Sequence, residues 1–368
     1  MKKITTIAIL AIGPRSSIIL NQILKITFLG LSFLLPKIAS ADCYDVGATG
    51  RLANYCALDK VRSVKINLRS LQFIDQKLKL EGRVKGLGFP SRLKASSISK
   101  NISPILSYSD NINGGNSSEP LVLGNNTFIG NETLYRKEGI VGGLGVGLNG
   151  RHIYAERRYL NYSINSSYTR SLKYGSGISS NNASFCSINH IKDWWFVDAC
   201  TNLSTTNKEI TDSKNNNISL VGSKVYSSDK NTYNEATLGM NLYHAETFTQ
   251  NQLLIGYKTI HSNGLYSAVN LTLGEGVENQ LTTQFAIKAQ LTAQINNKPL
   301  NLSINHTNSG GGMLLGFERN QSDIGILVSY PVWGYLDLNL GYRKSNSNID
   351  YYDSSTPTFG IQFKPYKF

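Results

Sequence analysis

The most concentrated set of reactive side chains lies in residues 151–159, where basic and aromatic residues alternate with small ones. Its functional members are Arg151, Tyr154, Arg157 and Arg158. Guanidinium groups that converge on a narrow passage bind anions, as rings of arginine do in pores. An arginine-rich turn that binds nothing would have the same composition. The sequence leaves both interpretations open.

Signals for catalysis are weak. The histidines are spread over segments far apart in the sequence, at His152, His190, His244, His261 and His306. No nucleophile elbow, zinc-protease motif, phosphate loop or dinucleotide fingerprint occurs. Neither CxxC nor HxxxH spacing is present, so no metal site is expected. We therefore predict a protein that is not an enzyme and has no cofactor. A hydrolase built from Ser and His on neighbouring strands is the least favoured alternative.

The four cysteines fall into two close pairs. Cys43 and Cys56 lie near the N-terminus, while Cys186 and Cys200 flank what looks like a hairpin. Even numbers of cysteines at short spacing are typical of exported proteins in an oxidising compartment. We expect two local disulfides, one within each pair.

Residues 1–41 have the features of a signal peptide. Lys25 precedes the apolar run at residues 26–35, and Ala39-Ser40-Ala41 is a small-x-small cleavage signal. A permanent N-terminal anchor is the alternative. Export argues against a nucleic-acid partner, although interleaved arginine and tyrosine also occur in nucleic-acid binders.

Residues 42–100 form a short basic segment. Residues 59–100 hold 11 basic and 3 acidic side chains. Much of the net charge of the whole chain, which is +13, is therefore concentrated in this stretch. Val61, Val64 and Leu68 fit a helix face, whereas Val64, Ile66 and Leu68 fit a strand face, so the pattern does not decide between them. The segment would be a plug, a periplasmic appendage or a linker packed on the barrel mouth. Its basic face would suit an acidic polymer or lipid headgroups, unless it is only a solvated surface.

Residues 101–368 alternate in polarity over many short runs. From Phe285 to Ile295 apolar residues occupy every second position, with mostly polar residues between them, and Leu300, Leu302 and Ile304 resume the alternation. A period of two gives an extended chain one apolar and one polar face. The composition agrees with this pattern, since 40% of residues are hydrophobic and only 17% are charged.

These runs predict an all-β fold, an antiparallel transmembrane up-and-down β-barrel of about 14 strands, with a short N-terminal extension. The first strand is expected near Ile102, and the polar stretch at residues 205–217 as an outer loop. The last strand changes phase near Lys364-Pro365, which predicts a bulge. Tryptophans at strand ends, including Trp194 and Trp195, suit an interfacial aromatic belt. A soluble β-sandwich is the alternative.

The C-terminal run ends in an aromatic residue, Phe368, after Phe359, Ile361 and Phe363. This ending resembles the closing strand of Gram-negative outer-membrane β-barrels. The resemblance implies a location in the outer membrane of a Gram-negative bacterium, in contact with lipid and lipopolysaccharide. It also implies that the barrel assembly machinery recognises Phe368.

A narrower resemblance lies in the first predicted strand and the loop after it. Pro104 opens the strand, and Asp110, Asn111 and Asn113 end it. This motif is similar to the start of the C-terminal barrel in surface lipoprotein assembly modifiers. The resemblance implies a barrel that assists translocation or surface display of an exported client protein. The chain departs from that family because residues 42–100 are short and lack its helical repeats.

Two functions follow. The first is the translocation or display of a client protein. The alternative is a passive porin-type channel for small solutes, with Arg151, Arg157 and Arg158 at its narrow point.

Overall fold

The computed structural model describes Cys43, residues 50–63 and residues 96–367, except for positions 156, 230, 335, 364 and 365. The predicted signal peptide, most of the basic segment and Phe368 lie outside the described residues. The helices are α2 (Arg51–Ser63), η1 (Glu132–Leu134) and η2 (Asp350–Tyr352). The strands are β1 (Ser96–Ser109), β2 (Leu121–Leu123), β3 (Asn126–Phe128), β4 (Gly139–Ala155), β5 (Arg158–Ser171), β6 (Gly177–Lys192), β7 (Trp195–Asn207), β8 (Asp212–Asp229), β9 (Thr232–Ala245), β10 (Thr249–Ile260), β11 (Tyr266–Gly274), β12 (Thr282–Ile295), β13 (Lys298–Leu314), β14 (Phe317–Trp333), β15 (Leu336–Ser347), β16 (Ser354–Phe363) and β17 (Tyr366–Lys367).

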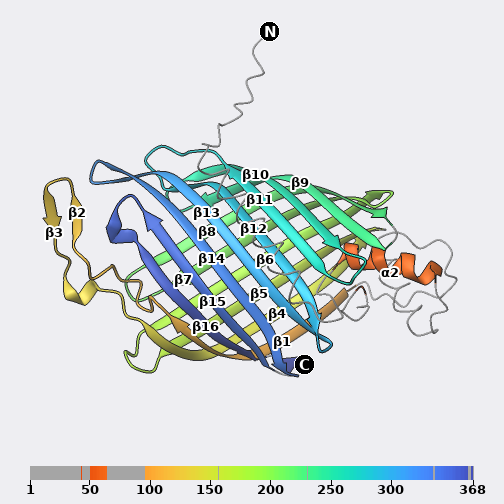
Figure 1. The fold of residues 1–368 in the computed structure, drawn as a ribbon, viewed down its shortest axis with the longest axis horizontal. Coiled ribbons are helices and arrows are strands. Elements are labelled where there is room, and N and C mark those ends of the chain that lie inside the picture. The colour runs from red at the N-terminus through yellow and green to blue at the C-terminus, as the bar shows by residue number, and fades with distance from the viewer. Residues whose placement is uncertain are drawn as a thin grey trace, which may run out of the picture. The chain divides into compact units, whose positions relative to one another are not determined.

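The long strands form one closed antiparallel barrel (Figure 1). From β4 to β16 each strand pairs with its neighbours in sequence, and β1 pairs with β4 on one side and with β16 and β17 on the other. The barrel therefore has 14 strands, with β17 continuing the line of β16. Closure leaves no unpaired edge, which a sheet in lipid requires. The predicted up-and-down barrel and its strand number are confirmed.

The seam between the first and last strands changes register around the positions of the expected bulge, Lys364 and Pro365, which themselves lie outside the described residues. Ile105 pairs with Gln362, and Ile102 pairs with Tyr366, so three steps along β1 match four along the last strand. The extra residue changes the phase, which turns both Phe359 and Tyr366 outward. Pro104 lies on β1 between these two pairs, where proline, which cannot donate to the ladder, is tolerated.

Two predicted boundaries were wrong. β1 begins at Ser96, before the expected start near Ile102. The polar stretch at residues 205–217 is mostly strand, since only residues 208–211 connect β7 to β8. Asn and Asp, and to a lesser degree Lys and Glu, are poor strand formers on propensity alone. Here the ladder to a neighbouring strand holds them extended, in a part of the sheet that faces water.

The outer surface of the barrel is apolar. Leu220 and Leu238 are 58% and 60% exposed, and Met240 is 72% exposed. The outward rows also include Ile140, Leu144, Val146, Ile164, Ile218, Ile255, Val269, Ile326, Leu340 and Phe359. In water such rows would be a large aggregation surface, whereas in a bilayer they match the hydrocarbon. None of the described helices is long and apolar enough to span a membrane.

The two ends of the barrel differ. At one end, the turn end, two-residue connections join β4 to β5, β6 to β7, β8 to β9, β12 to β13 and β14 to β15. The other end, the loop end, carries the long connection at residues 110–138 with its β2–β3 hairpin. β1 starts and β17 ends at the turn end. Outer-membrane barrels have short periplasmic turns and longer extracellular loops, which makes the turn end periplasmic.

Both expected disulfides are present. Cys43 is bonded to Cys56 at the start of the described chain, and Cys186 is bonded to Cys200 across β6 and β7. The second bridge points into the lumen, because Cys186 and Cys200 share a face with Asp198 and oppose the exposed Leu203.

Candidate functional site

The lumen is lined mainly by short neutral polar side chains. On every long strand these residues alternate with the outward apolar ones, so they face inward. They include Asn101, Ser103, Ser163, Asn165, Ser167, Ser180, Asn182, Ser184, Asn202, Ser204, Asn217, Ser219, Asn241, Asn270, Thr272, Gln290, Thr292, Asn301, Ser303, Asn305, Asn339 and Thr358. A recess of about 260 Å³ lies against the wall formed by β1, β4, β5, β6 and β7. The lumen is thus polar and nearly neutral.

Glycines on β4 make room for this lining. A Cβ atom on Gly147 would lie 2.7 Å from the amide oxygens of both Asn101 and Asn165. Glycine at this position therefore lets the two amide side chains lie over the β4 backbone. The glycine run that alternates with Leu144 and Val146 thins the wall beside the recess.

The four arginine and tyrosine candidates do not converge. Arg151 lies on β4 with its side chain toward the lumen, in register with the inward residues Ser97 and Asn161. Arg157 lies in the β4–β5 turn with a left-handed backbone, at φ 63°. Their neighbours Tyr154 and Arg158 are exposed on the outer face.

Tyr154 bonds to the outer side of the wall. Its hydroxyl lies 2.7 Å from Ser187 Oγ and donates to Asn189 Oδ1 at 2.8 Å. The structure therefore brings only Arg151 into the lumen. The rest of the set fits the other interpretation of the sequence, an arginine-rich turn at the membrane edge.

The loop-end motif residues hold a connection across the mouth. Asn113 is fully buried, and its side chain donates to Tyr135 O at 2.9 Å and accepts from Lys137 N at 2.8 Å. The backbone carbonyl of Asn113 accepts from the backbone N–H of Ile210, in the β7–β8 loop, at 2.9 Å. Lys208 Nζ donates to Asn111 O at 2.8 Å.

On the other side of the seam, Thr356 on β16 donates to Asp110 Oδ2 at 3.2 Å. The segment after β1 is thereby fixed to two separated parts of the rim. Pro104 lies in the barrel wall, away from this loop. Pro104, Asp110, Asn111 and Asn113 therefore have local structural roles rather than forming one site.

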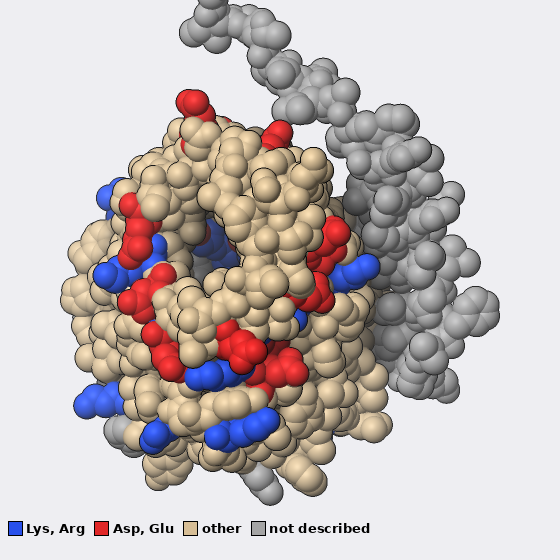
Figure 2. Space-filling view, turned by 90° about the vertical axis from the view of Figure 1, so that its left-hand side faces the viewer, with Lys and Arg blue, Asp and Glu red and all other residues tan. Residues whose placement is uncertain are grey.

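Charged groups ring the loop end. Figure 2 views this end and shows a hollow at its centre, with Asp, Glu, Lys and Arg side chains around it. Glu209 accepts from Ser176 Oγ at 2.6 Å and pairs with Lys137 at 3.4 Å. The Ser176 hydrogen bond, more than the lysine, holds the pKa of the Glu209 carboxyl below its usual value. Burial lowers the pKa of Lys208 in the same loop.

At the turn end, α2 is seated inside the mouth. Its face formed by Leu52, Ala53 and Cys56 is at most 1% exposed, and packs in one cluster with the inward residues Phe196 and Tyr233. The helix contacts β8, β9 and β10, at the right of Figure 1. The wall also supplies a polar contact, since Tyr233 donates to Asp59 Oδ2 at 2.9 Å.

Trp194 forms part of this seat rather than the aromatic belt expected from the sequence. It lies in the β6–β7 turn with a left-handed backbone at φ 64°, which is costly for a bulky residue. Its ring is 3% exposed and meets Tyr55 of α2 edge-on, with the ring centroids 4.9 Å apart. Trp195, at 53% exposure, and Trp333, at 57%, face outward as expected.

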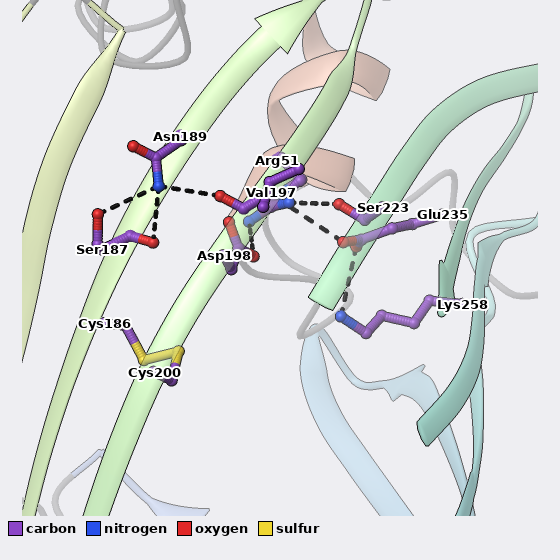
Figure 3. Close-up of polar contacts among 10 residues, drawn as sticks. All are labelled: Arg51, Cys186, Ser187, Asn189, Val197, Asp198, Cys200, Ser223, Glu235 and Lys258. Carbon is purple, nitrogen blue, oxygen red and sulfur yellow. Dashed lines mark hydrogen bonds and ion pairs between the residues drawn. A yellow bond between two sulfur atoms is a disulfide. The ribbon is translucent and has the colours of Figure 1, made fainter. Parts of the chain in front are cut away.

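A buried charge cluster holds the start of α2 to the wall (Figure 3). Arg51 Nη2 lies 2.5 Å from Asp198 Oδ2 on β7, and Arg51 Nη1 donates to Ser223 Oγ on β8. Arg51 Nε is 3.9 Å from Glu235 Oε1 on β9. The Arg51 side chain is 10% exposed, and its Cζ lies 4.3 Å from the centre of the Phe196 ring.

Lys258 completes the cluster from β10, with Nζ 3.3 Å from Glu235 Oε2. Two carboxylates are therefore balanced by two cations, one from the wall and one from the helix. A buried charge is tolerated only when it is paired in this way.

The Cys43–Cys56 disulfide tethers the chain before α2 to the buried face of the helix. In Cys56→Ser we expect α2 to leave its seat more often, because the tether is lost and a hydroxyl replaces a sulfur that is 0% exposed. Trypsin should then cut after Arg51 or Lys60 several times faster than in the wild-type protein. The Cys200→Ser variant, which breaks the other disulfide, is the control, and its cleavage in α2 should not change.

Sequence reasoning found neither Arg51 nor its partners. The contacts join residues 147 and 172 positions apart, and no local pattern encodes them. One signal was present. Asp198 stands between Val197 and Ala199 in a run that otherwise lacks charge, and a lone carboxylate there needs a partner.

Potential metal ligands are dispersed in the part of the chain that the structure describes. No group of three or more potential metal ligands occurs there. The histidines make separate contacts, such as His244 with Thr249 at 2.7 Å and His261 with Ser267 at 2.9 Å.

No family model matches this chain, and no curated protein matches it significantly. Among solved structures, OprB of Pseudomonas putida is 7% identical and covers 74% of this chain and 94% of its own, with a TM-score of 0.43. A BenF-like porin of Pseudomonas fluorescens is 7% identical, over 75% of this chain and 100% of its own, with a TM-score of 0.41. The beta domain of the Bordetella autotransporter BrkA is 10% identical, over 75% and 100% of the two chains, with a TM-score of 0.30. Similarities this low carry no functional argument. On its closed sheet, apolar exterior and polar interior, the chain has the fold of a transmembrane β-barrel of the outer-membrane type.

Proposed function

We propose that the protein is a non-enzymatic, passive channel for small polar solutes. The observation that carries this proposal is the lumen itself, where short hydroxyl and amide side chains face inward on nearly every strand. Such a lining exchanges hydrogen bonds with water and with neutral polar solutes, and gives ions little electrostatic preference.

The charges inside the lumen largely cancel. Lys258 pairs with Glu235, and Arg343 pairs with Asp323 at 3.3 Å. Two elements restrict the passage, the α2 helix on one side of the turn end and the connection at residues 110–116 across the loop end. We infer that the barrel passes solutes when α2 is displaced and passes little when it is seated.

The other function expected from the sequence, translocation or display of a client protein, has less support. Of its motif residues, Asp110, Asn111 and Asn113 serve the loop-end connection and Pro104 lies in the barrel wall, and no contact among the described residues points to a client. A specific protein missing from the cell surface after gene deletion would favour display over the channel.

The channel is tested by ion conductance in planar bilayers. Since Arg151 is the inward member of its group, Arg151→Ala should shift the reversal potential in a salt gradient toward cation preference by several millivolts. Arg158→Ala removes the same charge from the outer face, close by at the same turn, and should leave the reversal potential unchanged. A barrel that never conducts, with or without α2 seated, would contradict the channel.

A further inference from the structure

We propose that the wall of the turn-end mouth contains a binding site for guanidinium groups, which Arg51 occupies as a tethered ligand. The site, here called the guanidinium site, consists of Asp198, Ser223, Glu235 and the ring of Phe196. This inference rests on the proposed channel, because the site would act on solutes that pass the mouth.

The geometry matches a guanidinium and not merely a positive charge. The two terminal nitrogens of Arg51 go to different acceptors, Nη2 to Asp198 and Nη1 to Ser223, while Nε faces Glu235 at 3.9 Å. The central carbon of the group, Cζ, lies over the Phe196 ring, 4.3 Å from its centre. A planar fork of donors with a weakly hydrated face fits this arrangement, whereas a compact, strongly hydrated ammonium does not.

The charge balance also calls for one cationic guest. Glu235 is 7% exposed and Asp198 17% exposed in their side chains, and among the described wall residues a single cation, Lys258, pairs with Glu235. Without Arg51 the mouth would hold a partly buried negative charge. A cationic solute would remove that cost.

The position of Arg51 in the helix supports the same conclusion. It is the first residue of α2, where the helix dipole disfavours positive charge and where no acidic residue stands in the first turn. The helix thus gains nothing from a cation at this end. All four residues of the site come from the barrel wall, on β7, β8 and β9, so the wall keeps the site when the helix leaves.

A solute with a guanidinium group would therefore compete with α2 for the mouth. Binding of such a solute would displace Arg51, weaken the seat of α2 and widen the passage for that class of solute. The channel would thus be opened by the solute that it transports.

The test uses the full-length protein in detergent with three probes of similar size, methylguanidinium, methylammonium and methylurea, at equal ionic strength. In Arg51→Ala, calorimetry should show methylguanidinium binding at least tenfold more tightly than methylammonium, and no binding of methylurea. In the double variant Arg51→Ala/Asp198→Asn, the binding of methylguanidinium should be abolished. Heat-modified mobility on gels shows that each variant is folded.

In the wild-type protein, methylguanidinium should also shift the emission of Trp194 to longer wavelength, since displacing α2 uncovers that ring. The measurement is made with Trp195 and Trp333 replaced by Phe. Equal binding of methylguanidinium and methylammonium, or binding that survives Asp198→Asn, would overturn the site. Selective binding in a barrel that does not conduct would refute the channel and leave the site standing.

Discussion

Arg51→Ala is expected to open the turn end of the barrel. Removing one partner of a buried ion pair costs about 3–5 kcal/mol, because the remaining charges stay desolvated. The barrel wall cannot move, so the helix should leave and let water reach Asp198 and Glu235. A change of this size lowers the ratio of seated to unseated helix by about 10²–10⁴-fold. Single-channel conductance in planar bilayers should rise severalfold.

Lys288→Ala is the matched control for Arg51→Ala. Lys288 is exposed in the lumen on β12, away from the strands that α2 contacts. This variant also removes one positive charge from the passage, but it leaves the helix seated, so the current amplitude should stay near that of the wild type. Equal currents in wild type and Arg51→Ala would mean that α2 is no barrier.

Leu220→Arg is expected to destabilise the barrel by about 2–4 kcal/mol, the cost of a lipid-facing arginine near the bilayer midplane. Leu220 is 58% exposed and pairs with Met240, which is 72% exposed, in the middle of the apolar band. The measurement is reversible unfolding by urea in lipid vesicles, followed by tryptophan fluorescence.

Ser219→Arg places the same side chain one position earlier on β8, where it faces the lumen. Stability should change little, while the added charge should alter ion preference. A larger loss of stability from Ser219→Arg than from Leu220→Arg would show that the faces of β8 are assigned the wrong way round.

Much of the barrel was predictable because the alternation of apolar and polar residues within each strand shows which side chains lie on each face. The alternation at Leu300, Leu302 and Ile304 needs only the local sequence, and so does the phase change before Tyr366 that marks the bulge. The close spacing of Cys186 and Cys200 similarly predicted a bridge across one hairpin.

The seat of α2 was not predictable in the same way. Val64 and Leu68 fitted both a helix and a strand, and both lie outside the described residues. Only packing against Tyr233 and its neighbours shows where the described helix lies. Polar runs such as residues 205–217 were misassigned for a related reason. Their side chains carry no apolar signal, and their extended shape comes from strands distant in the sequence.

The lumen-facing disulfide has a consequence for biogenesis. Cys186 and Cys200 are separated by 14 positions in sequence, so a single hairpin brings them together early. After the barrel has closed and entered the bilayer, an oxidising enzyme of the periplasm has no route to sulfur atoms inside the wall. An enzyme that forms this bond would therefore act before the barrel closes, on a hairpin in which β6 and β7 are already paired.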